Sequence, residues 1–197
     1  VVLSCVENSI SLYPEGSEAW QMKGILAQKM KNHEEALEYL RKAISLNPDD
    51  MLAWNAKAVS LYKLQKSQEA LASVAHALDI LRLKVHNDKI WEVQLLTLKG
   101  DFLQDMLLWD EAHEAYDQAL KINAESIIPI LQKARLFAQS NHLTKMYEYL
   151  EKALAIKPIL SKELLSDRCF KPFSKETAFQ QLIAPYQPLS STPPPAQ

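Results

Sequence analysis

A spacing of 34 residues is the feature that most constrains how this chain can fold. Residues 17–50, SEAWQMKGILAQKMKNHEEALEYLRKAISLNPDD, have the apolar pattern of two short amphipathic helices, and Pro48 ends the second one. Gly24 in the first helix and Ala36 in the second are small residues on the apolar faces, which indicates that the two backbones come close together. One such helical hairpin cannot cover both of its apolar faces, so the pattern predicts further copies of the unit.

The copies are present along most of the chain. The small residue of the first helix recurs at spacings of 34, 42 and 34 residues, as Gly24, Ala58, Gly100 and Ala134. Two positions of the second helix recur as Ala36, Ala70, Ala112 and Met146, and as Ala43, Ala77, Ala119 and Ala153. The position of Trp20 is filled by Trp54, Leu96 and Ile130, and that of Pro48 by Arg82, Ala124 and Pro158. The second copy therefore lacks both the glycine and the proline, and the fourth has Met146 in place of an alanine.

This pattern resembles the tetratricopeptide repeat (TPR) over residues 17–158. The resemblance implies an all-α fold, a right-handed superhelical solenoid of antiparallel helix pairs. The expected repeats are 17–50, 51–84, 93–126 and 127–160, with an insertion at 85–92. We expect the insertion to lengthen the two helices that meet near His86–Asp88, with Asp88 or Asn87 as the helix cap. Trp91 in this segment can either pack against the lengthened partner helix or serve as an exposed anchor, and average burial favours packing.

The segments outside the repeats carry their own signals. Pro14 lies 34 residues before Pro48, so residues 1–16 are expected to form the second helix of a truncated preceding repeat. Residues 159–184 are expected to form a C-terminal helical cap, with short helices near 159–166 and 175–184. Residues 185–197 are rich in proline, serine and threonine and are expected to form a disordered tail.

Composition excludes several function classes. The net charge of −2 gives no electrostatic argument for nucleic acid or an acidic membrane surface. No apolar run is long enough to span a bilayer, and no signal peptide is visible, so we expect a cytoplasmic protein without membrane insertion. Cys5 and Cys169 form no metal or redox motif and are expected to be reduced packing residues, with a bridge between them as the less favoured alternative.

The sequence contains no recognisable catalytic constellation. Its three glycines are isolated, its five histidines are isolated, and neither HExxH nor CxxC occurs. Acidic pairs such as Asp49–Asp50 lie where helices begin, which is typical of caps and of partners for the helix dipole. We therefore expect no enzyme, no cofactor and no metal within these residues.

The expected function is that of a protein–protein interaction scaffold. In the TPR family, the first helices of successive repeats line a concave groove, so the resemblance implies lining residues at fixed offsets from the small residue. The main candidates are Gln21, Ile25, Gln28, Asn55, Val59, Tyr62, Thr97, Asp101, Gln104, Leu131 and Arg135. The same offsets add Glu18, Leu52, Gln94, Ile128 and Ala138. This amide-rich surface with apolar patches suits a protein, an extended peptide or a partner helix.

One TPR subfamily binds the carboxylate of chaperone tails with paired cationic residues. The matching positions hold Gln21, Ile25, Ala56, Gln94 and Leu98, so the cations are missing. We therefore expect no clamp for a chaperone-tail carboxylate. Two alternatives remain open: a regulatory TPR module of a larger multidomain protein or enzyme, and a self-assembling structural array. The sequence alone does not give the oligomeric state, which stays unknown.

Overall fold

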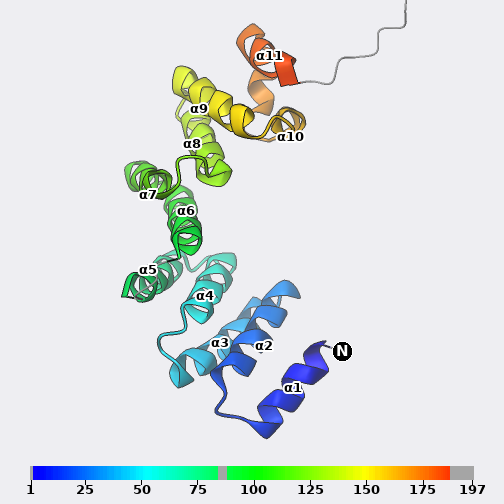
Figure 1. Ribbon diagram of the computed structural model, residues 1–197, viewed down its shortest axis with the longest axis vertical. Coiled ribbons are helices and arrows are strands. Elements are labelled where there is room, and N and C mark those ends of the chain that lie inside the picture. The colour runs from blue at the N-terminus through cyan, green and yellow to red at the C-terminus, as the bar shows by residue number, and fades with distance from the viewer. Residues whose placement is uncertain (1, 84–87, 187–197) are drawn as a thin grey trace, which may run out of the picture. The chain divides into compact units, whose positions relative to one another are not determined.

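A computed structural model describes residues 2–83 and 88–186 of the chain, with side chains from residue 4 onward. Within these residues the protein is all-α, with two short 3-10 helices and no strand, which confirms the expected fold class (Figure 1). In chain order the helices are α1 (Val2–Leu12), α2 (Ser17–Lys29), α3 (His33–Leu46), α4 (Met51–Lys63), α5 (Ser67–Leu83), α6 (Lys89–Asp105), α7 (Trp109–Ile122), α8 (Ile127–Gln139), α9 (Leu143–Ile156), α10 (Leu160–Ser166), η1 (Lys171–Phe173), α11 (Thr177–Ile183) and η2 (Ala184–Tyr186).

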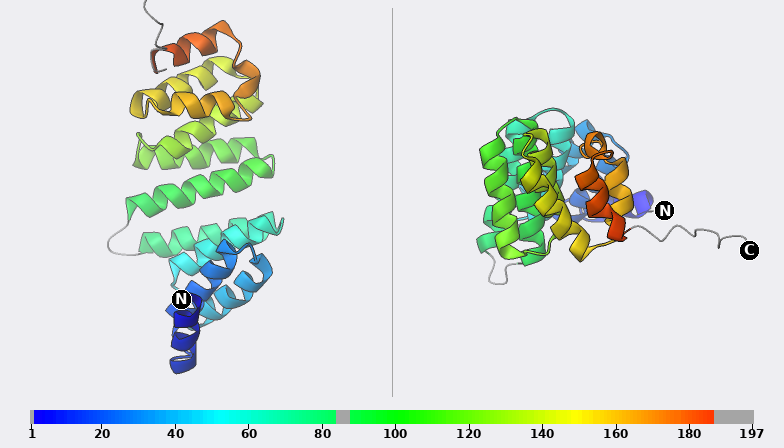
Figure 2. Two further views of the ribbon diagram at one scale, coloured as in Figure 1. Left: turned by 90° about the vertical axis from the view of Figure 1, so that its right-hand side faces the viewer. Right: turned by 90° about the horizontal axis from the view of Figure 1, so that it is seen from above.

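The chain divides into two compact units, which are described separately. The N-terminal unit comprises residues 1–122 and the C-terminal unit residues 123–197. Helices pair as hairpins, α2 with α3, α4 with α5 and α6 with α7 in the first unit, and α8 with α9 in the second (Figure 2). In the N-terminal unit each hairpin also packs on the next, because α3 contacts α4 and α5 contacts α6. Helix α1 packs against α2 and buries Val6.

Small residues let the two helices of a hairpin approach each other. A side-chain carbon added at Gly24 would lie 2.6 Å from Cγ of Leu40 on α3. At Gly100 the added carbon would overlap the ring of Tyr116, a fully buried residue of α7. The recurring alanines of the second helices are completely buried, as the close approach requires. At Gly24 and Gly100 the facing side chain thus occupies the space that a side-chain carbon would need.

Each hairpin turns through the same backbone motif. The residue after the first helix's C-cap has a positive φ in all four repeats, at Lys31, Gln65, Leu107 and Asn141. In the first repeat the Lys31 N–H donates to the Gln28 carbonyl (2.9 Å), and the Asn32 N–H donates to the Ala27 carbonyl (2.9 Å). These two bonds are those of a Schellman motif, and equivalent pairs close the other three turns. None of the four residues is glycine, so each turn holds a side chain in the left-handed region.

A tryptophan joins consecutive hairpins in the first two repeats. Nε1 of Trp20 donates to the carbonyl of Pro14 (2.8 Å), and Nε1 of Trp54 donates to the carbonyl of Pro48 (2.8 Å). The proline stops the preceding helix and its carbonyl then accepts from the indole, so the two residues fix the turn between repeats together. The later repeats have Leu96 and Ile130 at this position, which bury apolar surface and donate no such bond.

The insertion between the second and third repeats lengthens two helices. α5 and α6 each have 17 residues, whereas the other repeat helices have 13 or 14. Asp88 caps α6, because its carboxylate accepts from the backbone N–H of Ile90 (2.9 Å). The helix ends are also linked by an ion pair between Arg82 and Glu92 at 2.9 Å. His86 and Asn87, where the helices were expected to meet, lie outside the described residues.

The segment after the fourth repeat is compact and helical. α10 and α11 lie close to the expected short helices. Leu164 on α10, Phe179 on α11 and Phe170 between them are buried. The expected tail is partly different, since Pro185 and Tyr186 belong to η2 and the Tyr186 carbonyl accepts from the Ser161 hydroxyl (3.1 Å). Residues 187–197 lie outside the described part of the chain. Both cysteines are unpaired, and Cys5 is exposed and not the expected packing residue.

Candidate functional site

The amides predicted to line a groove on α2 are bonded to the next repeat. Nε2 of Gln21 donates to both carboxylate oxygens of Asp50 (2.7 and 2.8 Å). Nε2 of Gln28 donates to the carbonyl of Ala56 and the hydroxyl of Ser60 (2.9 and 3.0 Å). Both glutamines therefore hold α2 against α4.

Tyr62 on α4 and the polar candidates on α6 also make internal contacts. The Tyr62 ring stacks on Phe102 with ring centroids 4.4 Å apart. Thr97 is buried, and its hydroxyl donates to the Val93 carbonyl (2.6 Å) within α6. The remaining two candidates on α6, Asp101 and Gln104, accept from the hydroxyl of Tyr116 at 2.8 and 3.1 Å.

In the C-terminal unit, Arg135 holds the capping segment. Its Nε and Nη2 donate to Oδ2 of Asp167 (3.1 and 2.8 Å), and its Nη1 donates to Oε1 of Gln132 (2.7 Å). The other carboxylate oxygen of Asp167 accepts from the backbone N–H of Cys169 (2.8 Å). Burial raises the pKa of the Cys169 thiol, which disfavours its thiolate form. Leu131, the second candidate on α8, is half-buried.

Three further candidates of the N-terminal unit keep part of their surface exposed, although Ile25 also packs on the apolar core. Ile25 on α2 and Asn55 and Val59 on α4 are half-buried. The side chain of Asn55 makes no hydrogen bond within residues 4–83 and 88–186. The structure thus separates a smaller set of open positions from the residues that join the repeats.

A hollow of about 350 Å³ lies at the N-terminal ends of α2, α4 and α6. We call it the Trp91 hollow, and its lining residues are Glu18, Gln21, Asn47, Asp49, Asp50, Met51, Leu52 and Trp91. Trp91 is half-buried because it packs on the apolar core and also lines the hollow. Packing of Trp91 on the core is therefore observed, and its role as an anchor for a partner stays a prediction.

The charge of this hollow is negative. Its lining includes the three carboxylates of Glu18, Asp49 and Asp50, and no lysine or arginine. Asp50 is used internally, since it binds Gln21 and also caps α4 by accepting from the Ala53 N–H (3.0 Å). Glu18 and Asp49 form no ion pair with any residue that the structure describes.

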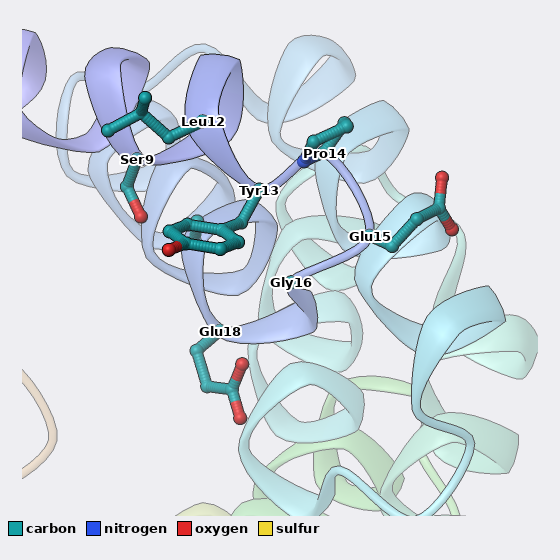
Figure 3. Close-up of a pocket in the computed structure, with 8 residues that line it drawn as sticks. Ser9, Leu12, Tyr13, Pro14, Glu15, Gly16 and Glu18 are labelled. Carbon is teal, nitrogen blue, oxygen red and sulfur yellow. The ribbon is translucent and has the colours of Figure 1, made fainter.

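A second hollow of about 690 Å³ lies where α1 turns into α2 (Figure 3). We call it the Tyr13 hollow, and its lining residues are Ser9, Leu12, Tyr13, Pro14, Glu15, Gly16, Glu18 and Ala19. Leu12 and Tyr13 are each 73% exposed, and Glu15 points away from Glu18. Oε1 of Glu15 lies 3.8 Å from Nζ of Lys42, so Glu15 has a cationic partner. Glu18 lines both this hollow and the Trp91 hollow.

Sequence reasoning found part of this surface. Glu18 and Leu52 follow from the repeat offsets, but Asp49 and Asp50 were interpreted only as residues at a helix start. Leu12 and Tyr13 were missed, although Tyr13 directly before Pro14 is a usable signal, since the equivalent position before Pro48 holds Asn47. No cluster of metal-ligating side chains occurs in the described ranges, and no helix there is both long and apolar enough to cross a bilayer.

Family models described as tetratricopeptide repeat match residues 17–50, 39–72 and 130–159. The chain is a tetratricopeptide-repeat protein. The first match covers the reference repeat from which the 34-residue period was identified. The TPR class is one of protein-interaction scaffolds, and this general function agrees with the sequence analysis. No curated protein matches the sequence.

Solved TPR structures share the fold at low sequence identity. YrrB, described as a TPR protein with an unusual peptide-binding site, superimposes with a TM-score of 0.65 at 13% identity, over 92% of this chain and 90% of YrrB. The type IV pilus biogenesis factor PilW superimposes with a TM-score of 0.77 at 19% identity, over 93% of this chain and 80% of PilW. MamA gives 0.68 at 16% identity, over 81% of this chain and 89% of MamA.

Proposed function

We propose that this TPR protein is a scaffold that binds a protein segment on the surface formed by α2, α4 and α6. The observation that carries the proposal is the Trp91 hollow, which takes side chains from the first helices of three successive repeats. Peptide recognition by a TPR fold has a precedent in YrrB, a TPR protein with an unusual peptide-binding site. A hollow that crosses repeats suits an extended segment, because such a segment places successive side chains against successive helices.

The contacting residues follow from which side chains are free. Gln21, Gln28, Asp101 and Gln104 hold neighbouring helices, so they position the surface and are poor choices as ligand contacts. Ile25, Asn55 and Val59 are open on α2 and α4 and can meet a bound segment. With Glu18, Leu52 and Trp91 they supply an amide, several apolar side chains and a carboxylate.

The charge of the surface argues against a chaperone-tail carboxylate as the ligand. The clamp positions Gln21, Ala56 and Gln94 carry no positive charge. In addition, Glu18 and Asp49 would repel an anionic terminus brought to the Trp91 hollow. We propose that the ligand is bound through its internal residues.

Selection from a random peptide library on the immobilised chain tests the proposal. The selected peptides are then titrated against Asn55→Ala and Leu52→Ala variants by fluorescence anisotropy. Loss of contacts at the centre of an interface is expected to weaken binding by about tenfold or more. The matched controls are Gln68→Ala and Leu83→Ala, which change exposed positions of α5 and should leave binding unchanged.

Two results would contradict the proposed function. One is a selection that yields no peptide better than its scrambled counterpart. The other is equal affinity for the α4 variants and the parent chain while the α5 controls are also unchanged, since the ligand would then bind elsewhere.

A further inference from the structure

We propose that the bound segment carries a lysine or arginine between apolar residues and lies across both hollows, with the cation beside Glu18 and Asp49. This inference rests on the proposed function and adds the chemical class of the ligand. It combines three observations: two hollows that share Glu18, apolar side chains in the lining of each, and two lining carboxylates, Glu18 and Asp49, without an ion pair in the described chain.

Each of the two hollows has apolar residues in its lining. Leu12 and Tyr13, both largely exposed, line the Tyr13 hollow. Leu52 and Trp91 line the Trp91 hollow. Glu18 belongs to both linings, so it links the two apolar regions. A segment with apolar residues on either side of one cation would bury apolar surface at both places, which is the main favourable term in association.

The carboxylates are available for a charged ligand. Glu18 and Asp49 have no ion pair in the described chain, and the hollow between them and Trp91 has no basic residue in its lining. The wider field has the same sign, since residues 1–122 contain 13 Lys and Arg against 18 Asp and Glu. Such a surface accelerates the approach of a cation and disfavours an anion. Trp91 adds an aromatic surface, and an indole attracts a nearby ammonium or guanidinium group.

Charge complementarity also decides between possible occupants. The chain's own last residues, QPLSSTPPPAQ at 187–197, contain no lysine or arginine and so lack the complementary charge. A second copy could offer Lys162, Lys171 and Lys175, but these belong to a folded capping segment and not to a free strand. A basic segment of another protein satisfies both the charge and the shape of the two hollows.

The test uses the full chain and four labelled peptides of one length, identical except for a central Arg, Lys, Gln or Glu between leucines. Anisotropy titrations should show the Arg and Lys peptides binding about tenfold more tightly than the Gln peptide, and the Glu peptide binding most weakly. Raising the salt concentration should reduce the difference between the Arg and Gln peptides, because the carboxylates are solvent-accessible.

A double variant assigns the charge effect to the site. The Glu18→Gln/Asp49→Asn variant should bind the Arg peptide only as tightly as it binds the Gln peptide. Its affinity for the Gln peptide should equal that of the parent chain. Asp50 is not altered, because it caps α4. Glu38→Gln and Glu34→Gln together form the control, since they remove two exposed carboxylates from α3.

The possible failures are distinguishable. Equal binding of the Arg, Gln and Glu peptides would overturn the cation assignment and leave peptide binding intact. An absence of binding by all four, together with a failed library selection, would overturn the proposed function as well. A dimer in sedimentation experiments that the Glu18→Gln/Asp49→Asn variant dissociates would also overturn the inference, because a second copy would then be the occupant.

Discussion

At the scale of single residues, the hairpins depend on a match between a small residue on one helix and a larger one on the next. Gly100 faces Tyr116, whose ring fills the space where a side-chain carbon would lie. The Tyr116 hydroxyl is held by Asp101 and Gln104, so the ring cannot easily move aside. The glycine is a packing requirement here, since its cost within a helix is about 1 kcal/mol relative to alanine.

The Gly100→Ala variant is therefore expected to lower the free energy of unfolding, despite the better helix propensity of alanine. Overpacking typically costs about 1–3 kcal/mol. Chemical denaturation of the parent chain and the variant measures the difference. The same substitution in a Tyr116→Val background should cost much less, because the second repeat already pairs an alanine, Ala58, with the equivalent Val74. Equal costs in both backgrounds would show that the Tyr116 ring is not the obstacle.

At the scale of elements, the turns that join the first and second helices repeat more regularly than the sequence does. Lys31, Gln65, Leu107 and Asn141 share a left-handed conformation although their side chains have little in common. This regularity comes from the two backbone bonds of the Schellman motif, which do not depend on the side chain. Only Asn141 is a residue type that tolerates a positive φ well.

Leu107→Gly is expected to raise the stability of the α6–α7 hairpin. A non-glycine residue pays roughly 1 kcal/mol or more in the left-handed region, and Leu107 is 66% exposed, so little packing is lost. Thermal or urea unfolding measures the gain. Asn141→Gly should give a smaller gain, and Glu38→Gly within α3 should be destabilising by about 1 kcal/mol. A loss of stability on Leu107→Gly would mean that the leucine side chain makes a needed contact.

Sequence reasoning predicted the elements well, because the 34-residue period places small residues wherever two helices meet. Asp88, one of the two residues expected to cap α6, does cap it, and the short helices after Pro158 follow from the apolar residues between 160 and 183. The left-handed turns could not be predicted at Lys31, Gln65 and Leu107, since no glycine marks them. The contacts of Gln21 and Gln28 with the next repeat could not be predicted either, because the sequence does not distinguish a glutamine that binds a ligand from one that bonds to a neighbouring helix.

At the scale of the whole molecule, each compact unit has a tyrosine whose hydroxyl donates to a glutamate. Tyr39 donates to Glu35 in the N-terminal unit (2.6 Å), and Tyr147 donates to Glu176 in the C-terminal unit (2.8 Å). The bond to Glu35 is the main cause that raises the pKa of Tyr39 to about 12. Burial, followed by the bond to Glu176, raises the pKa of Tyr147 to about 12. Both phenols thus stay protonated in the folded chain at a pH where they ionise when unfolded.

The free energy of unfolding is expected to fall at high pH because of these two tyrosines. The pKa of a tyrosine in the unfolded chain is about 10, whereas the pKa values of Tyr39 and Tyr147 in the folded chain are about 12. The stabilisation is therefore complete below about pH 10 and is lost as the pH rises to about 12. Denaturant titrations across this range measure the free energy of unfolding. The Tyr39→Phe/Tyr147→Phe variant should lose less stability over the same window, and an unchanged pH dependence would contradict the assignment.

The contact between Gly100 and Tyr116 also limits the order in which the repeats can diverge. An array that grows by copying one unit starts with the same pair of residues in every copy. A tyrosine can enter the second helix only where the facing position is already glycine, and that glycine cannot then become alanine until the tyrosine has gone. The fourth repeat has the other combination, with Ala134 in the first helix and Leu150 in the second. Substitutions at the two positions should therefore be coupled in evolution. The change to glycine precedes the gain of the tyrosine, and the return to alanine follows its loss.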